Sequence, residues 1–256
     1  LGTGTTGTRS VNATAMTDTD VLTLTGAGSL TLSTDDADVV ASTYTGAITA
    51  TVTGTAAAAY TLGTVSSSID SSNTGGLTVD AGAMSDNQVL TISGAGAITV
   101  SALTADLTSA ATGTVVVTLD DDTGTVSTTV TNNASSGTLT VNSGLFDSDD
   151  TIVLAGTRAI AVVATDSVSV STGAKSASVS QESGKTATVN ATLMGDAETL
   201  TISGVGNFAV TGLKADLTST ADGGALSITT GDVSTQTIAL GTGTTGTRSV
   251  NATAMT

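Results

Sequence analysis

The sequence predicts an all-β protein and, within that class, a β-solenoid, a coil of short parallel strands stacked rung on rung. Apolar segments of about three to five residues recur about every 8 to 12 residues, with the two-residue period of a half-buried strand. The four aromatic residues are few for a sandwich core, which normally includes a large aromatic anchor. Pro, which lacks the N–H that strand ladders need, is absent. Tandem β-sandwich domains are the alternative.

The strand pattern runs along the whole chain. The apolar residues that alternate with Thr, Ser or Val are, in chain order, Leu22 and Leu24, Leu30 and Leu32, Leu90 and Ile92, Ile98 and Val100, Val115, Val117 and Leu119, Val168 and Val170, and Leu200 and Ile202. Branched side chains favour strands, and Gly, Asn, Asp and Ser between them favour turns. No apolar stripe of helical spacing persists, and the one helix-like run, Ala56 to Ala59, is too short for a stable helix.

The two ends of the chain carry the same segment. Residues 1–17 and residues 240–256 both read LGTGTTGTRSVNATAMT, with an offset of 239 residues. We interpret residues 1–239 as one unit of a longer tandem array and residues 240–256 as the start of the next unit. A short terminal duplication is the alternative. Fixed-period self-similarity of this kind is typical of repeat architectures.

A weaker repeat lies inside the unit. Each copy has a Met or Phe at an equivalent position, which we call its marker residue; the markers are Met16, Met84, Phe146, Met194 and Met255. The intervals between successive markers are uneven, the first being the longest and the third the shortest. The unit therefore divides into four degenerate modules, at about 11–78, 79–140, 141–188 and 189–239. A module of about 60 residues predicts three rungs of roughly 20 residues each.

Composition excludes several functions. The absence of Cys and His rules out zinc-finger, haem and iron–sulfur sites, and also the usual catalytic triads. A net charge of −16 with six basic residues argues against nucleic acid as a partner. No apolar run is long enough to span a membrane, so we expect no membrane insertion. No signal peptide is recognisable, so any secretion signal is expected to lie outside this sequence.

Asp is the only abundant reactive residue, and it clusters at expected turns. The candidate metal ligands are Asp18, Asp20, Asp35, Asp36, Asp38, Asp86, Asp120, Asp121, Asp122, Asp147, Asp149, Asp150 and Asp196. Clustered carboxylates are hard oxygen ligands, which suit calcium better than softer metals. The alternative is that these Asp side chains cap turns and keep the protein soluble. Because the carboxylates repeat along the chain and do not converge at one place, we expect no enzyme activity.

Two modules share a longer phrase, LTISGxGx[IF]xVxxLxADLTS, within acidic, Cys-free repeats that are rich in Thr, Gly and Asp. In style and composition the chain resembles repeats of giant secreted bacterial surface proteins, which include large adhesins, surface-layer proteins and extracellular fibres. The resemblance implies an extracellular, cell-surface location and a structural or adhesive role, often with calcium. It carries over no catalytic residue.

These observations predict a structural repeat of an extracellular bacterial filament or adhesin stalk that acts as a stiff rod. Its expected partners are neighbouring repeats of the same protein, end to end, with lateral fibre or cell-surface contacts as a further expectation. One alternative is a glycan- or surface-binding β-sandwich repeat, for which Tyr44 and Tyr60 are the only hint of an aromatic cluster. Another alternative is a surface-layer protein cemented by calcium.

Overall fold

The computed structural model of the chain describes residue 7 and residues 9–120, 124–243 and 245–255. The described residues form 25 β-strands and no helix, and the strands belong to two parallel sheets. The fold is thus an all-β parallel β-solenoid, as the sequence predicts. The chain divides into two compact units, Leu1–Asp120 with Asn133–Leu139, and Asp121–Asn132 with Thr140–Thr256.

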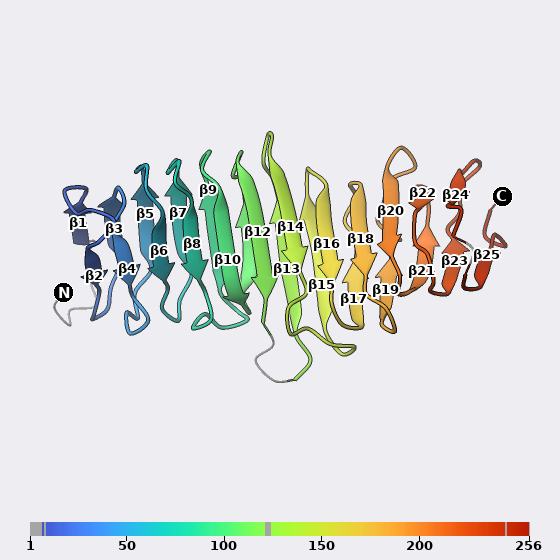
Figure 1. Cartoon of the computed structure of the whole chain (residues 1–256), viewed down its shortest axis with the longest axis horizontal. Coiled ribbons are helices and arrows are strands. Elements are labelled where there is room, and N and C mark those ends of the chain that lie inside the picture. Colours follow the sequence, from blue (N-terminus) through green and yellow to red (C-terminus); the bar gives the residue numbers. More distant parts are fainter. Residues whose placement is uncertain (1–6, 8, 121–123, 244, 256) are drawn as a thin grey trace. The chain divides into compact units, whose positions relative to one another are not determined.

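The first unit contains twelve strands that alternate between the two sheets (Figure 1). Its odd-numbered strands pair in the order β1 (Arg9–Ala13), β3 (Leu30–Thr34), β5 (Ile48–Val52), β7 (Ser67–Ser71), β9 (Val89–Ser93) and β11 (Asp106–Ser109). Its even-numbered strands pair in the order β2 (Val21–Thr23), β4 (Asp38–Val40), β6 (Ala58–Thr61), β8 (Leu77–Asp80), β10 (Ile98–Leu103) and β12 (Thr114–Leu119).

The second unit is built in the same way. Its odd-numbered strands pair in the order β13 (Ser127–Asn132), β15 (Thr151–Gly156), β17 (Val168–Ser171), β19 (Thr186–Asn190), β21 (Asn207–Leu213), β23 (Leu226–Thr230) and β25 (Arg248–Asn251). Its even-numbered strands pair in the order β14 (Thr138–Asn142), β16 (Ile160–Ala164), β18 (Ala177–Gln181), β20 (Thr199–Gly204), β22 (Asp216–Ser219) and β24 (Ile238–Leu240). The first two residues of β14 belong to the first unit.

A rung is one full circuit of the chain and contains one odd- and one even-numbered strand. Its length varies, because the step along the chain from Leu30 to its partner Ile48 is shorter than the step from Ser67 to its partner Leu90. The predicted rung length of about 20 residues is confirmed as the typical value. The apolar residues that predict strands all lie in or directly beside strands, and Ala58 begins β6, so the Ala run is not a helix.

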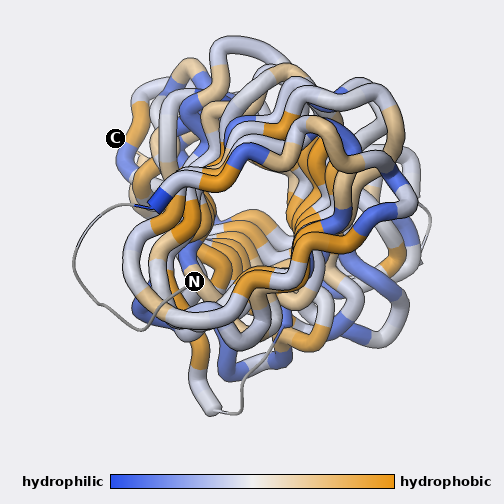
Figure 2. Tube along the Cα trace, turned by 90° about the vertical axis from the view of Figure 1, so that its left-hand side faces the viewer, coloured by the Kyte–Doolittle hydropathy of each residue, from blue (hydrophilic) through white to orange (hydrophobic). Residues whose placement is uncertain are grey.

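The core is a set of stacked apolar columns. In β5, Ile48, Ala50 and Val52 point inward and are buried, while Thr49 and Thr51 are exposed. Parallel pairing in register places like side chains directly above one another, as in the column of Leu32, Ala50, Ile69 and Ile92. Figure 2 shows hydrophobic residues along the inner wall of the coil. Branched side chains at alternate positions thus form the core that their two-residue period predicts.

The four modules do not contain equal numbers of rungs. The marker residues Met16, Met84, Phe146, Met194 and Met255 follow β1, β8, β14, β19 and β25 respectively. Among the described residues, the steps between markers are therefore seven, six, five and six strands, or three and a half, three, two and a half, and three rungs. The expected three rungs hold for the second and fourth modules and are wrong for the first and third. The module boundaries themselves stay a prediction.

Candidate functional site: the corner loops

Each marker residue lies in a loop with the same backbone geometry, and we call these loops the corner loops. The corner loops are residues 13–20, 81–88, 143–150, 191–198 and 252–255. In all five, the marker N–H donates to the carbonyl three residues earlier; the bonds are Met16 to Ala13 at 3.0 Å, Met84 to Ala81 at 2.9 Å, Phe146 to Ser143 at 3.0 Å, Met194 to Ala191 at 3.2 Å and Met255 to Ala252 at 3.2 Å. This is the hydrogen bond that closes a β-turn.

The residue before most corner loops fixes how the loop starts. The Asn12 side-chain oxygen accepts the Thr14 N–H at 3.0 Å, and Asn251 accepts the Thr253 N–H at 3.2 Å. Asp80 and Asn190 make the same bond to the residue two further along the chain. Short polar side chains bond to their own backbone in this way at turns. Local sequence therefore contributes to the conformation at the start of the loop.

The fourth residue after the marker closes the loop, and in three copies, Gln88, Asp150 and Glu198, it ties the loop to the preceding rung. The Gln88 Oε1 atom accepts the Ser66 N–H at 2.8 Å and the Ser66 hydroxyl at 3.0 Å. Glu198 accepts the Ser176 N–H at 2.8 Å and hydroxyl at 2.7 Å, and it pairs with Lys175 at 2.9 Å. The bonds to Ser176 and Lys175 lower the pKa of Glu198 to about 2.

Asp occupies the same closing position in the other two complete corner loops. The fully buried Asp150 accepts the Val126 N–H at 2.9 Å and the Asp147 N–H at 2.8 Å. Asp20 accepts the Thr17 N–H at 2.8 Å, and this bond and the bond from the Thr17 hydroxyl lower the pKa of Asp20. The side chain at this position thus bonds within its own loop in Asp20, to the preceding rung in Gln88 and Glu198, and to both in Asp150.

The Asp35, Asp36 and Asp38 cluster follows β3 and also connects rungs. Asp36 accepts the Ala56 N–H at 2.7 Å, and Asp38 accepts the Ala59 N–H at 2.8 Å. Asp35 accepts the Thr53 hydroxyl. All three donors lie one rung further along the chain, so these carboxylates join consecutive rungs at the edge of the coil.

The remaining candidate ligands lie at exposed or half-exposed positions. Asp18, Asp86 and Asp196 are exposed in their corner loops, Asp147 accepts the Asp149 N–H at 2.9 Å, and Asp120 is half-buried at the end of β12. Asp121 and Asp122 lie outside the described residues. Among the residues that the structure describes, no three acidic side chains are grouped closely enough to hold a metal ion. Calcium binding stays a prediction.

The two tyrosines belong to the core. Tyr44 and Tyr60 are both fully buried; the Tyr44 hydroxyl donates to the Gly28 carbonyl at 2.6 Å, and the Tyr60 hydroxyl bonds to Thr34. Burial raises the pKa of Tyr60 to about 12. The suggestion of an aromatic binding cluster at these residues was therefore wrong.

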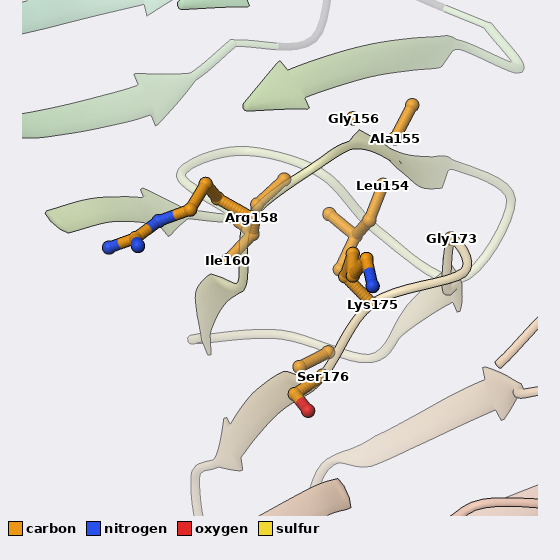
Figure 3. A pocket seen from close by; sticks show the side chains of 9 residues that line it. Leu154, Ala155, Gly156, Arg158, Ile160, Gly173, Lys175 and Ser176 are labelled. Atoms are coloured by element: carbon orange, nitrogen blue, oxygen red, sulfur yellow. The ribbon is translucent and has the colours of Figure 1, made fainter. Parts of the chain in front are cut away.

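A shallow hollow on the second unit holds about 190 Å³ of space, part of which is open solvent. It lies at the turns after β15 and β17, and two basic residues, Arg158 and Lys175, contribute to its lining (Figure 3). Figure 3 shows the two side chains extending in different directions. Lys175 is engaged with Glu198, so the hollow does not present two converging cations.

Comparison with known proteins identifies no relative. The chain is a β-solenoid that matches no family model, no curated protein and no solved structure. A search of the described residues for a helix long and apolar enough to cross a membrane finds none.

Sequence reasoning missed two residues of the corner loops, Gln88 and Glu198. Both could have been found, since each stands four residues after its marker, as Asp20 and Asp150 do. The search for clustered Asp overlooked them because neither is an Asp. The shared feature is a side-chain oxygen at a fixed position, which an amide and a longer carboxylate supply equally well.

Proposed function

We propose that the chain is a structural repeat of an extracellular bacterial filament or adhesin stalk, stiffened by stacked β-rungs. One observation carries the proposal: the identical segments at the two ends contain β1 and β25, which lie 24 strands apart. Because each rung contains two strands, one repeat corresponds to twelve rungs, which is a whole number. A following copy would therefore begin on the odd-numbered strands and continue the same coil.

The chemistry of the chain supports a structural role. Each rung pairs only with its neighbours, so stability adds up along the coil and does not limit its length. Asp36, Asp38, Asp150 and Glu198 form hydrogen bonds within turns or between rungs, which favours a structural role over a catalytic one. The absence of Cys makes the coil indifferent to redox conditions, and the acidic surface favours solubility outside the cell.

The proposed partners are consecutive repeats of the same protein, end to end. Cell-surface location, lateral contacts between fibres and calcium binding complete the proposal, and they rest on the composition and on the resemblance to secreted bacterial surface proteins. Two observations argue against the glycan-binding alternative: the fold is not a sandwich, and Tyr44 and Tyr60 are buried.

Cryo-electron imaging of a chain of several consecutive repeats tests the proposal. Twelve rungs stacked about 4.8 Å apart give an axial repeat of about 58 Å and a layer line at about 4.8 Å. A smooth filament with both spacings is the expected result. Beads at another interval, without the layer line, would contradict a continuous coil. Immunogold labelling of intact cells with an antibody to the chain tests the surface location.

A further inference from the structure

One sequence occurs at both ends of the chain, and each copy pairs with a different neighbour. Within the described residues, β1 pairs only with β3, so that Arg9 lies beside Leu30 and Val11 beside Leu32. At the other end of the chain, and again among the described residues, β25 pairs only with β23, so that Arg248 lies beside Leu226 and Val250 beside Ile228. The two copies together therefore show both neighbours of a single strand.

We propose that residues 9–16 and 248–255 are two views of one junction, in which a single strand joins β23 of one repeat to β3 of the next. The occupant of each open end is thus a second copy of this repeat, in a defined register. This inference rests on the proposed function and adds the contacts that hold consecutive repeats together.

Burial of the corner loops supports the junction. In the three internal copies, Val79, Val141 and Val189 are each 0% exposed, and their marker residues are buried as well. In the end copies, Val11 and both marker residues are only half-buried, and Val250 is 44% exposed. The same motif is therefore complete inside the chain and half-covered at its ends. A second copy on the open side would bury it as the internal copies are buried, which is favourable for apolar groups.

The arginine of the repeated segment provides a contact across the junction. At one end, Nη1 of Arg9 donates to the carbonyl of Ala27, in the following rung, at 2.7 Å. At the other end, Arg248 donates backward, from Nη1 to Gly224 at 3.0 Å and from Nη2 to Ala221 at 2.7 Å. A guanidinium carries five N–H donors, so one arginine has enough to serve all three carbonyls at once. At the junction it would tie the last rung of one repeat to the first rung of the next.

Close packing of glycines in successive rungs supports the same register between one repeat and the next. A Cβ atom placed on Gly246 would lie 2.1 Å from the Gly224 carbonyl oxygen, and one on Gly46 would lie 1.8 Å from that of Gly28. The equivalent atom on Gly7, at the open end, meets nothing within 4 Å. Because Gly7 and Gly246 are the same residue of the repeat, the junction would make one continuous column of close-packed backbone. Only Gly allows such an approach.

The test compares the chain with an extended chain that carries a second copy of residues 18–256 after Thr256. Backbone hydrogen exchange, read by mass spectrometry, is the measurement. The second copy carries ¹³C and ¹⁵N labels, introduced by ligating two separately expressed segments. Residues 248–255 of the first copy are followed in unlabelled peptides that begin before Leu240, because neither residues 1–17 nor the labelled second copy shares their mass. We expect exchange of this segment to slow by at least about tenfold on extension, because a paired and buried strand opens less often. Unchanged exchange would overturn the junction.

The arginine is tested in the same extended chain by Arg248→Gln at the junction, with Arg9→Gln at the open end as the matched control. We expect the junction variant to speed exchange on both sides, in residues 226–230 and in the second copy of residues 30–34. The control is expected to affect only its own end. Equal, local effects would overturn the role of the arginine, and circular dichroism verifies that both variants keep their strands.

The two proposals fail in different ways. Filaments that show the expected axial repeat but no slowing of exchange would sink this junction and leave the proposed function standing. Slowed exchange in a chain that is absent from the cell surface would support the junction and contradict the proposed location.

Discussion

Ala102 and Gly212 occupy the same position in the phrase that two modules share, and both have a left-handed backbone, with φ of 53° and 65°. Each lies at a point where the pairing of its strand, β10 or β21, shifts register. The irregularity thus belongs to the phrase. Ala102 is the only described non-Gly residue with positive φ, and an Ala is strained in that conformation whereas a Gly is not.

We therefore expect Ala102→Gly to stabilise the protein by about 0.5–1 kcal/mol, since relief of the left-handed strain outweighs the added freedom of the unfolded chain. The reverse change, Gly212→Ala, is expected to destabilise it by about 1–2 kcal/mol. Its new Cβ would also lie 2.9 Å from the Thr192 side chain. Urea unfolding measures both, and a loss of stability in Ala102→Gly would contradict this account.

Glu198 gives a prediction on pH. Its pKa of about 2 lies below the ordinary value of 4.5, so its bonds to Ser176 and Lys175 stabilise the fold above pH 4.5. That contribution is lost as the pH falls from about 4.5 towards 2. Because solvent reaches the pair, we expect it to be worth on the order of 1 kcal/mol.

The chain supplies the design of the matched variant, since Gln88 makes the same bonds to Ser66 without a charge. Glu198→Gln should keep most of the stability at pH 7 and flatten its decline between about pH 4.5 and 2, relative to the unaltered chain. Glu198→Ala should lose the bonds at every pH. An unaltered acid profile in Glu198→Gln would show that another group controls this range.

At the scale of elements, the corner loops give the sharpest contrast. Met194 is 2% exposed, whereas Met255, its equivalent at the end of the chain, is half-buried. We expect Met194→Ala to cost about 2–4 kcal/mol, as for other buried side chains cut back to Ala. The same change at Met255 should cost less than about 1 kcal/mol.

Thermal unfolding of the two variants makes this comparison within one sequence motif. Equal costs would mean that the loop is stabilised by its own turn hydrogen bonds and gains little from burial of the marker. If the costs of the two variants differ in the single chain and become equal once the second repeat is added, burial of the marker residue is the cause of the difference.

Sequence predicted the strands well, because inward Leu, Ile and Val alternate with outward Thr and Ser along the chain. The rung count was missed in the first and third modules. The signal was present, since the interval from Met16 to Met84 is longer than the average, and the interval from Phe146 to Met194 is shorter, by about half a rung each. Averaging the intervals to one common module length concealed the half rungs.

The candidate site was only partly predictable. Sequence placed Asp at turns, but it could not show that Asp36 or Asp150 bonds to backbone about one rung away, because rung length varies and fixes which residue lies opposite. Tyr44 and Tyr60 were misjudged for a related reason. A rare aromatic in a Thr-rich chain does not reveal which face of its strand it occupies when its neighbours are small.

At the scale of the whole molecule, the net negative charge is expected to lower thermal stability. The net charge is −16, and the described residues contain two salt bridges, Lys175–Glu198 and Lys185–Asp166. Repulsion among the uncompensated carboxylates is screened by salt. We expect the midpoint of thermal unfolding to rise by about 2–4 °C between about 20 and 500 mM NaCl. A falling midpoint would show that attractive pairs outweigh the repulsion.

The same experiment tests the calcium prediction. Calcium chloride at matched ionic strength should raise the midpoint further than sodium chloride does if specific sites exist, since binding to the native state alone stabilises it. Magnesium chloride serves as the control for divalent charge. Identical curves for the three salts would contradict calcium sites anywhere in the chain.

The half rungs bear on how such a gene can change. Recombination between the copies at Met16 and Met194, which both follow odd-numbered strands, adds or removes nine whole rungs and leaves every later strand on its own sheet. An exchange between the copies at Met16 and Met84 shifts the chain by three and a half rungs, and every later strand would have to join the opposite sheet. Similar sequences are therefore not equivalent crossover points, and the fold restricts which duplications and deletions yield a protein that still coils.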